Sequence, residues 1–112
     1  MQLAIFEPLS PTVQPTVHKG ATLQERFQAF HKANPHVYRA LRQIALNLKR
    51  AGHTRYSIKG LFEVLRFDYS MRTASDDGFK LNNNLSALYA RKLMAEEPRL
   101  RDFFAVRKRR TM

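Results

Sequence analysis

Apolar residues recur at helical spacing along most of the chain, and the strongest such pattern covers residues 35–51. Its buried face is predicted to hold Val37, Leu41, Ile44, Ala45 and Leu48. Asn34 is placed to cap this helix, Pro35 suits its first turn, and Gly52 can end it in a left-handed conformation. The other side of the helix is basic and carries Arg39, Arg42, Lys49 and Arg50. This stripe is either a solvated face or a surface that meets phosphates.

A short helix is predicted before this pattern. Thr22 and Glu25 form a capping box. The apolar residues Leu23, Phe27 and Phe30 then follow at helical spacing. A helix over about residues 23–32 should therefore bury its aromatic side.

Another helix is predicted after it, over residues 58–71, with Ser57 as its cap. Its inner face holds Ile58, Leu61, Phe62, Leu65 and Tyr69. Val64, Phe67 and Met71 widen the apolar surface beyond an ordinary amphipathic stripe. A helix this apolar is expected to be the central one of the domain.

The segment from Gly78 to Pro98 joins a run of asparagines to an amphipathic helix, and we take this helix as the candidate recognition helix. Any of Asn82, Asn83 and Asn84 can cap it, and it should run to about Glu97, where Pro98 stops it. The packed side is predicted to hold Leu85, Tyr89, Ala90, Leu93 and Met94. The outward side carries Asn84, Leu88, Arg91 and Lys92.

The two ends of the chain differ from its helical middle. Residues 1–20 contain three of the five prolines and are predicted to form an extended arm. Its apolar tip, residues 3–6, should dock either on the domain or on a partner. Residues 21–106 form one helical domain, closed by a last short helix that buries Leu100, Phe103 and Phe104, and residues 107–112 form a basic tail.

Together these elements predict an all-α domain of four or five helices with a helix-turn-helix-like or winged-helix-like centre. The polar connection at residues 72–78 is long for a tight helix-turn-helix, whose turn usually has three or four residues. A short strand pair between residues 79–81 and 55–57 would complete the winged-helix-like form.

Charge is the feature of the composition that bears most on function. Twenty Lys and Arg against nine Asp and Glu give the 112 residues a formal net charge of +11. Polyanions are the natural partners of such a chain. The densest basic block is the tail, with Arg107, Lys108, Arg109 and Arg110. The sequence has no cysteine, no run of about 18 apolar residues and no signal-peptide pattern, so we expect a cytoplasmic protein.

Catalytic and metal-binding patterns are weak in this sequence. The four histidines, His18, His31, His36 and His53, show no ligand spacing. The adjacent carboxylates, Asp76 with Asp77 and Glu96 with Glu97, lie in a loop and at a helix end. Only four glycines are present, and none forms a phosphate-binding loop. We expect no metal, no cofactor and no catalysis, while acids that converge from distant positions leave a small nuclease as an alternative.

Nucleic-acid binding fits the charge and the candidate recognition helix together. The residues expected to contact nucleic acid on that helix are Lys80, Asn82, Asn83, Asn84, Arg91 and Lys92. Arg and Asn side chains make bidentate contacts with guanine and adenine edges, and a capped helix start points N–H groups at phosphate. The basic stripe within residues 39–50 and the tail would add phosphate contacts. Capping and turn chemistry is the alternative role for each Asn.

Three blocks of the sequence, NPHVYRAL, IKGLFEVLRF and FKLNNNLSALYARKLM, resemble a widespread family of small, mostly uncharacterised proteins of bacteriophages, prophages and bacterial genomes. The similarity covers roughly residues 23–107 and leaves the arm outside. It implies a bacterial or phage setting, in which small basic helical proteins act as DNA-binding regulators or as inhibitors of host machinery. The resemblance attaches no activity, cofactor or catalytic residue to these positions.

The sequence thus predicts a non-catalytic DNA-binding protein with a regulatory role and duplex DNA as its first-choice partner. The main alternative is an inhibitor or adaptor of phage type that binds a host protein complex. RNA binding and a small nuclease are further alternatives.

Overall fold

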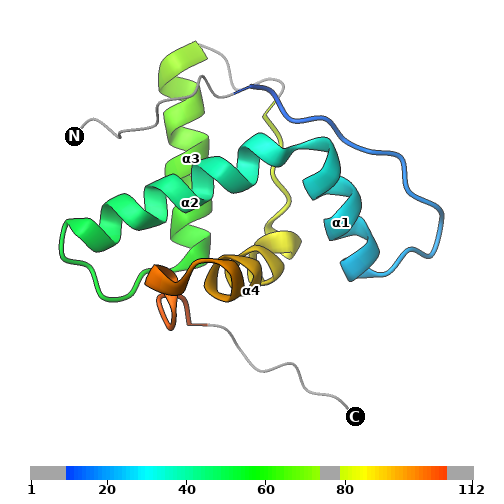
Figure 1. Ribbon diagram of the computed structural model, residues 1–112. Coiled ribbons are helices and arrows are strands. Elements are labelled where there is room, and N and C mark those ends of the chain that lie inside the picture. Colours follow the sequence, from blue (N-terminus) through cyan, green and yellow to red (C-terminus); the bar gives the residue numbers. More distant parts are fainter. Residues whose placement is uncertain (1–9, 74–78, 106–112) are drawn as a thin grey trace.

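Four α-helices and two short 3-10 turns make up the part of the chain that the computed structural model describes, residues 10–73 and 79–105 (Figure 1). In chain order they are α1 (Leu23–Ala33), α2 (Pro35–Arg50), α3 (Ile58–Thr73), η1 (Asn83–Leu85), α4 (Ser86–Glu96) and η2 (Pro98–Leu100). The predicted all-α class is therefore confirmed. The four α-helices lie close to where the apolar spacing placed them. The predicted last helix is only the turn η2, although Leu100, Phe103 and Phe104 are buried as expected.

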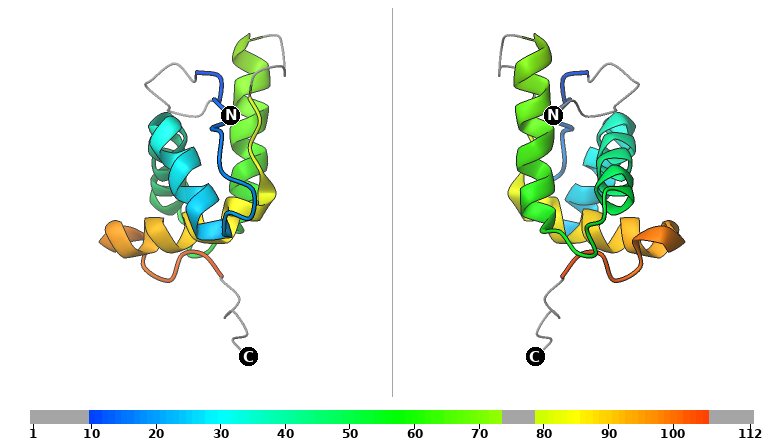
Figure 2. Two further views of the ribbon diagram at one scale, coloured as in Figure 1. Left: turned by 90° about the vertical axis from the view of Figure 1, so that its right-hand side faces the viewer. Right: turned by 90° about the vertical axis from the view of Figure 1, so that its left-hand side faces the viewer.

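Helix α2, and not α3 as the sequence predicted, is the hub of the arrangement, because α1, α3 and η2 all contact it. Phe67 and Met71, which made α3 look central, are exposed. α3 stands across α2, and α4 lies across the lower end of α3 (Figures 1 and 2). The core between them includes the fully buried rings of Phe62, Tyr89 and Phe103. Phe27 meets the ring of Tyr89 edge to face, with the ring centroids 4.8 Å apart. Aromatic packing of this kind joins α1 and α4 across the middle of the domain.

Local capping chemistry fixes most of the helix ends, as the sequence predicted. The Thr22 hydroxyl accepts a hydrogen bond from the Glu25 N–H at 3.1 Å, and the Glu25 carboxylate accepts one from the Thr22 N–H at 2.8 Å. Ser57 Oγ accepts from the Gly60 N–H at 3.2 Å, at the start of α3. Gly52 follows α2 with φ of 111°, a left-handed conformation that favours glycine.

Asn34 occupies the N-cap position of α2 as predicted, but its side chain makes no capping hydrogen bond, which corrects the predicted role of the amide. Its side chain is fully buried and pairs with the backbone of Val13: the Val13 N–H donates to Oδ1 at 2.7 Å, and Nδ2 donates to the Val13 carbonyl at 2.8 Å. Nδ2 also donates to the Phe30 carbonyl at 3.0 Å. The amide thus pairs with both backbone groups of Val13, as a neighbouring β-strand would. It holds the arm at residue 13 against the junction of α1 and α2.

The arm docks on the domain at a second place as well. Thr12 Oγ1 accepts from the Lys80 N–H at 2.7 Å and donates to the Lys80 carbonyl, which the Gln14 amide also reaches at 3.0 Å. Docking of residues 10–20 on the protein's own domain is therefore the observed arrangement. The predicted docking of the tip, residues 3–6, lies outside the described residues.

The predicted strand pair is not formed between the segments that were expected to carry it. The Tyr56 N–H donates to the Phe103 carbonyl at 3.1 Å, and the backbone of Lys80 is occupied by Thr12. No strand occurs in residues 10–73 or 79–105. The segment at residue 56 thus binds the segment after η2, and the segment at residue 80 binds the arm. A winged-helix form gains no support from these contacts.

Candidate nucleic-acid interface

Exposed cations from four elements gather at one end of the molecule. The 51–57 connection joins the C-terminal end of α2 to the first turn of α3, and η2 contacts α2 (Figure 1). The Lys49 ammonium donates to the Arg99 carbonyl, which ties the end of α2 to η2. The Tyr56–Phe103 backbone bond ties the connection to the segment after η2. We call the exposed cations at this end the basic pole: Lys49, Arg50, Arg55, Lys59, Arg99 and Arg101.

A buried carboxylate fixes the geometry of the basic pole. Glu97 follows α4 and accepts hydrogen bonds from Arg42 Nη2 at 2.8 Å and from Arg99 Nε at 2.8 Å. It also accepts from the Arg99 backbone N–H at 3.3 Å and so caps η2. The Arg99 hydrogen bond, followed by that of Arg42, lowers the pKa of Glu97 to about 2. One carboxylate therefore holds η2 against α2.

The predicted basic stripe on α2 divides between two roles. Arg42 is half-buried and its guanidinium is committed to Glu97, so it holds the pole in place rather than forming part of its free surface. Lys49 and Arg50 are exposed and belong to the basic pole. Arg39 is also exposed, but it lies near the N-terminal end of α2. Phosphate contact remains a prediction for these three residues.

The outward face predicted for α4 is smaller than expected. Lys92 lies half-buried between α4 and α2: its ammonium is 2.6 Å from Glu96 Oε2 and 5.5 Å from the centre of the Tyr38 ring. The Tyr38 hydroxyl donates to the same carboxylate, at 2.8 Å from Oε1. Arg91 is also half-buried, and Leu88 packs against the core. The face of α4 that the sequence predicted to enter a DNA groove is thus partly used for helix packing.

Asn82 and Asn83 use their side chains for hydrogen bonds within the fold. Asn82 Oδ1 accepts from the Asn84 N–H at 2.9 Å and so caps η1, and Asn83 Oδ1 accepts from Arg66 Nη2 at 2.6 Å. The Asn84 side chain and that of Lys80 are exposed. The 11 residues of α4 separate the run from η2, so about 16 Å lies between these two segments.

The structure therefore places the candidate residues from sequence at separate sites. Lys80 and the asparagine run precede α4, Arg91 and Lys92 lie in its middle, and the others lie on α2 or in the tail. Arg107, Lys108, Arg109 and Arg110 lie outside the described residues. Four members of the basic pole were not predicted: Arg55, Lys59, Arg99 and Arg101. Their position depends on contacts between residues 49 and 99 and between residues 56 and 103, which no local pattern reveals. The density of cations at Arg99 and Arg101, just before the basic tail, was the available signal.

The start of α3 adds to the positive potential of the pole. Ser57 caps this 16-residue helix between Arg55 and Lys59. A helix start carries a partial positive charge, and its first N–H groups have no partner within the helix. The electrostatics of the helix and of its flanking cations therefore have the same sign.

The described residues also bear on metal binding and on membrane insertion. Within residues 10–73 and 79–105, no three His, Cys, Asp or Glu side chains come together in a way that could hold a metal ion. His18 lies 3.4 Å from the Glu25 carboxylate, and His31 stacks on Phe27. None of the helices in this part of the chain is long and apolar enough to cross a membrane.

Comparison of the chain with protein-family models, with curated proteins and with solved structures gave no match. The resemblance to the phage and bacterial family therefore stays a prediction, and the case for function rests on the chain's own geometry and charge.

The Glu97 cluster gives a testable pH dependence. Because its folded pKa is about 2 and its ordinary value is 4.5, the ionised carboxylate stabilises the fold above pH 4.5. This stabilisation should be lost as the pH falls from about 4.5 toward 2. Glu97→Gln should lower the melting temperature at pH 7, and the difference from wild type should shrink steadily in acid. Thermal unfolding followed by circular dichroism measures this difference at each pH.

The exposed carboxylate Glu63 provides the matched control, since Glu63→Gln removes a charge from the surface of α3. Its effect on the melting temperature should be small at every pH. A Glu97→Gln difference that is the same at pH 7 and at pH 2 would show that the ion pairs with Arg42 and Arg99 do not stabilise the fold.

Proposed function

We propose that this protein is a non-catalytic nucleic-acid-binding protein that holds duplex DNA at the basic pole. The observation that supports the proposal most directly is the presence of six exposed cations on segments that adjoin one another: the end of α2, the 51–57 connection, the start of α3 and residues 98–101. Of these six, Arg99 is also hydrogen-bonded to Glu97. A net charge of +11 provides long-range attraction to a polyanion, and the pole gives that charge a direction.

The pole suits phosphates better than base edges. Arg50, Arg55 and Arg101 are exposed, and no carboxylate is found bonded to their side chains in the described part of the chain. Long cationic side chains around a capped helix start make the kind of contacts that position a protein on a DNA backbone. We therefore propose a binding mode dominated by phosphate contacts, with the first turn of α3 facing the DNA in place of α4.

Duplex DNA is favoured over single strands by the aromatic residues of the pole. Proteins that bind single strands stack successive bases on exposed rings that alternate with cations. Tyr56 is half-buried over Gly60, and its ring lies edge to face with that of His53 at 5.8 Å. In the 51–57 connection, the first turn of α3 and residues 98–105, His53 therefore provides the one exposed ring. A single ring is too little for a stacking platform.

The biological setting is a proposal that rests on the resemblance. A phage or bacterial protein in the cytoplasm, acting as a regulator, fits a small basic helical domain that contacts the DNA backbone. The helix-turn-helix interpretation, which took the helix after the 72–78 connection as the recognition helix, stays a prediction. We propose that α2, the 51–57 connection and α3 form the helical pair that faces the DNA instead.

Salt dependence tests the proposed function. If about four to six phosphates are neutralised, log K for duplex DNA should fall against log salt with a slope of roughly −4 to −5. A gel-shift or fluorescence titration over a range of NaCl concentrations, run in parallel with single-stranded DNA and RNA, measures the slope. A slope near zero, or no binding at low salt, would remove the nucleic-acid proposal and favour a protein partner.

A further inference from the structure

The outer face of α3 carries an apolar stripe that the fold leaves uncovered. Phe67 and Met71 are 65% and 71% exposed, the largest exposures of big apolar side chains in the described chain. They are four residues apart and therefore lie one above the other on the same face of α3, where they form the exposed apolar stripe. The core side of α3 is separate and complete, since Leu61, Phe62 and Leu65 are fully buried there.

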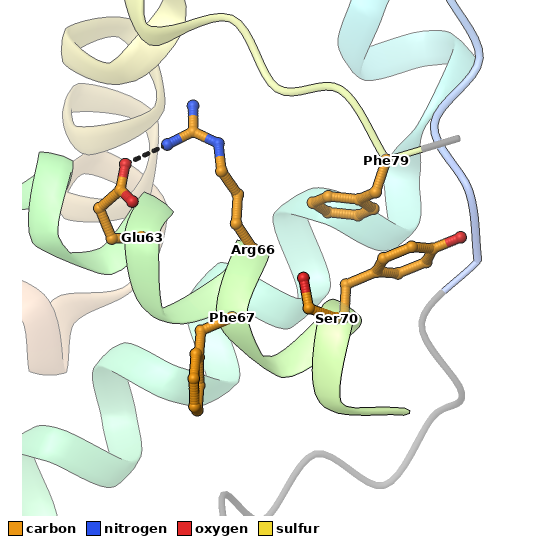
Figure 3. A pocket seen from close by; sticks show the side chains of 6 residues that line it. Glu63, Arg66, Phe67, Ser70 and Phe79 are labelled. Carbon is orange, nitrogen blue, oxygen red and sulfur yellow. Dashed lines mark hydrogen bonds and ion pairs between the residues drawn. The ribbon is translucent and has the colours of Figure 1, made fainter. Parts of the chain in front are cut away.

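A hollow lies beside this stripe. It has a volume of about 350 Å³ and is lined by Glu63, Arg66, Phe67, Tyr69, Ser70 and Phe79. Tyr69 and Phe79 stack with their ring centroids 4.7 Å apart and form an apolar wall. Phe67 leaves α3 on the side opposite Arg66 and extends away from Phe79 (Figure 3). The same patch thus offers an exposed aromatic side chain and, beside it, a hollow.

The charges around the stripe are neutralised within the chain. Arg66 forms an ion pair with Glu63 and donates to the Leu81 carbonyl and to Asn83. Arg72 lies 3.0 Å from the Asp68 carboxylate. In a protein with a net charge of +11, this face is one that another strongly basic molecule can approach without meeting unpaired arginines.

We propose that this face binds a second copy of the chain about a two-fold axis, with α3 packed against its counterpart. A two-fold interface uses the same patch on both subunits, so that patch must contain both a projecting group and a recess for it. Phe67 and Met71 provide the first, and the hollow beside Tyr69 and Phe79 provides the second. Each subunit then inserts its projecting side chain into the recess of the other.

The location of the stripe is compatible with the basic pole. Twelve residues separate Lys59, in the pole, from Met71, which corresponds to about 18 Å along α3. A pair joined at the far end of α3 therefore keeps both poles free and away from each other. The inference goes beyond the proposed function and does not depend on it, because the pairing needs no nucleic acid.

Molar mass in solution tests the pairing, measured by sedimentation velocity without nucleic acid. As the concentration rises from about 10 to 200 µM, the range for a small interface, the mass should rise from 13.1 kDa toward twice that value. Added NaCl should strengthen the pairing, because it screens the repulsion between two positive copies. Nucleic-acid binding has the opposite salt dependence, so failure of either idea can be recognised separately.

Two exposed apolar residues provide a matched pair of variants. Phe67→Ser should raise the dissociation constant of the pair by about 10- to 100-fold, as for a central aromatic anchor. Val13→Ser removes a side chain that is 58% exposed on the arm and should leave the mass unchanged. Circular dichroism should show both variants folded, since neither side chain belongs to the core.

Cross-linking tests the position of the axis. The chain contains no cysteine, so Ser70→Cys and Lys59→Cys each introduce a single thiol. A short bismaleimide should link Ser70→Cys chains in pairs and leave Lys59→Cys chains single. A mass of 13.1 kDa at every concentration, or equal pairing of wild type and Phe67→Ser, would overturn the proposal and leave the face to a different protein.

Discussion

Replacing Arg50, Arg55 and Arg101 together by Gln should lower the affinity for duplex DNA by roughly 100-fold at about 0.15 M salt. Each neutralised phosphate contributes about 0.9 times the logarithm of the inverse salt concentration to log K, so three contacts contribute about two logarithmic units. The slope of log K against log salt should become shallower by about 3. All three side chains are exposed, and the fold should remain intact.

The control for this variant removes the same charge from another side of the molecule. Lys19, Arg26 and Lys32 are exposed on the arm and α1, away from the pole (Figure 1). Their replacement by Gln also lowers the net charge from +11 by three to +8. The affinity should fall much less than in the pole variant. An equal loss in the two variants would mean that total charge, and not the basic pole, controls binding.

Asn34→Leu should lower the free energy of unfolding by about 2 to 4 kcal/mol. The substitution keeps a similar volume but removes two hydrogen bonds to the Val13 backbone and one to the Phe30 carbonyl. Residues 10–17 should lose their hold on the α1–α2 junction and exchange their amide hydrogens faster. Urea unfolding measures the stability, and hydrogen exchange by mass spectrometry measures the release of the arm.

Asn84→Leu is the matched control, because this asparagine is exposed and its change should alter stability by less than about 0.5 kcal/mol. DNA affinity should stay the same in both variants, since neither residue lies in the basic pole. A folded Asn34→Leu variant with wild-type stability and an unchanged arm would show that the buried amide does not hold the arm.

The helices and their ends could be predicted because their causes lie within a few residues of each other. The Thr22–Glu25 box, Pro35 and the left-handed Gly52 are all where the sequence placed them. The predicted inner face of α3 is buried throughout. Apolar periodicity therefore identified both the elements and the side on which each one packs.

The role of the Asn34 side chain could not be predicted from its neighbours in sequence. An asparagine just before a proline and an apolar run fits a helix cap, and nothing nearby in the sequence distinguishes that role from a distant one. The partner it uses, Val13, lies 21 residues away in a segment without periodicity. Lys92 shows the same limit, because the aromatic ring that it faces belongs to Tyr38 on α2. A charged residue on a helix surface can be solvated or packed, and the tertiary contact decides.

The basic pole could not be predicted for a similar reason. It brings Lys49 to Arg99 and Tyr56 to Phe103, across 50 and 47 residues of sequence. Charge density along the chain pointed to α2 and to the tail, and it gave no information about which turns lie beside them. The predicted kind of partner, a polyanion, stays a prediction, and the sequence did not identify the surface that we propose to meet it.

The contact between Thr12 and Lys80 has a consequence for how the chain reaches its final form. These residues are 68 positions apart, and the entropy of closing so long a loop must be overcome before their hydrogen bonds can form. Helices α1, α2 and α3 can pair earlier, through neighbours in sequence. During synthesis the arm is made before the domain, and Thr12 has no place to bind at residue 80 until most of the domain has been made. Val13 can bind Asn34 earlier, so the contact at Thr12 is the later of the two that hold the arm.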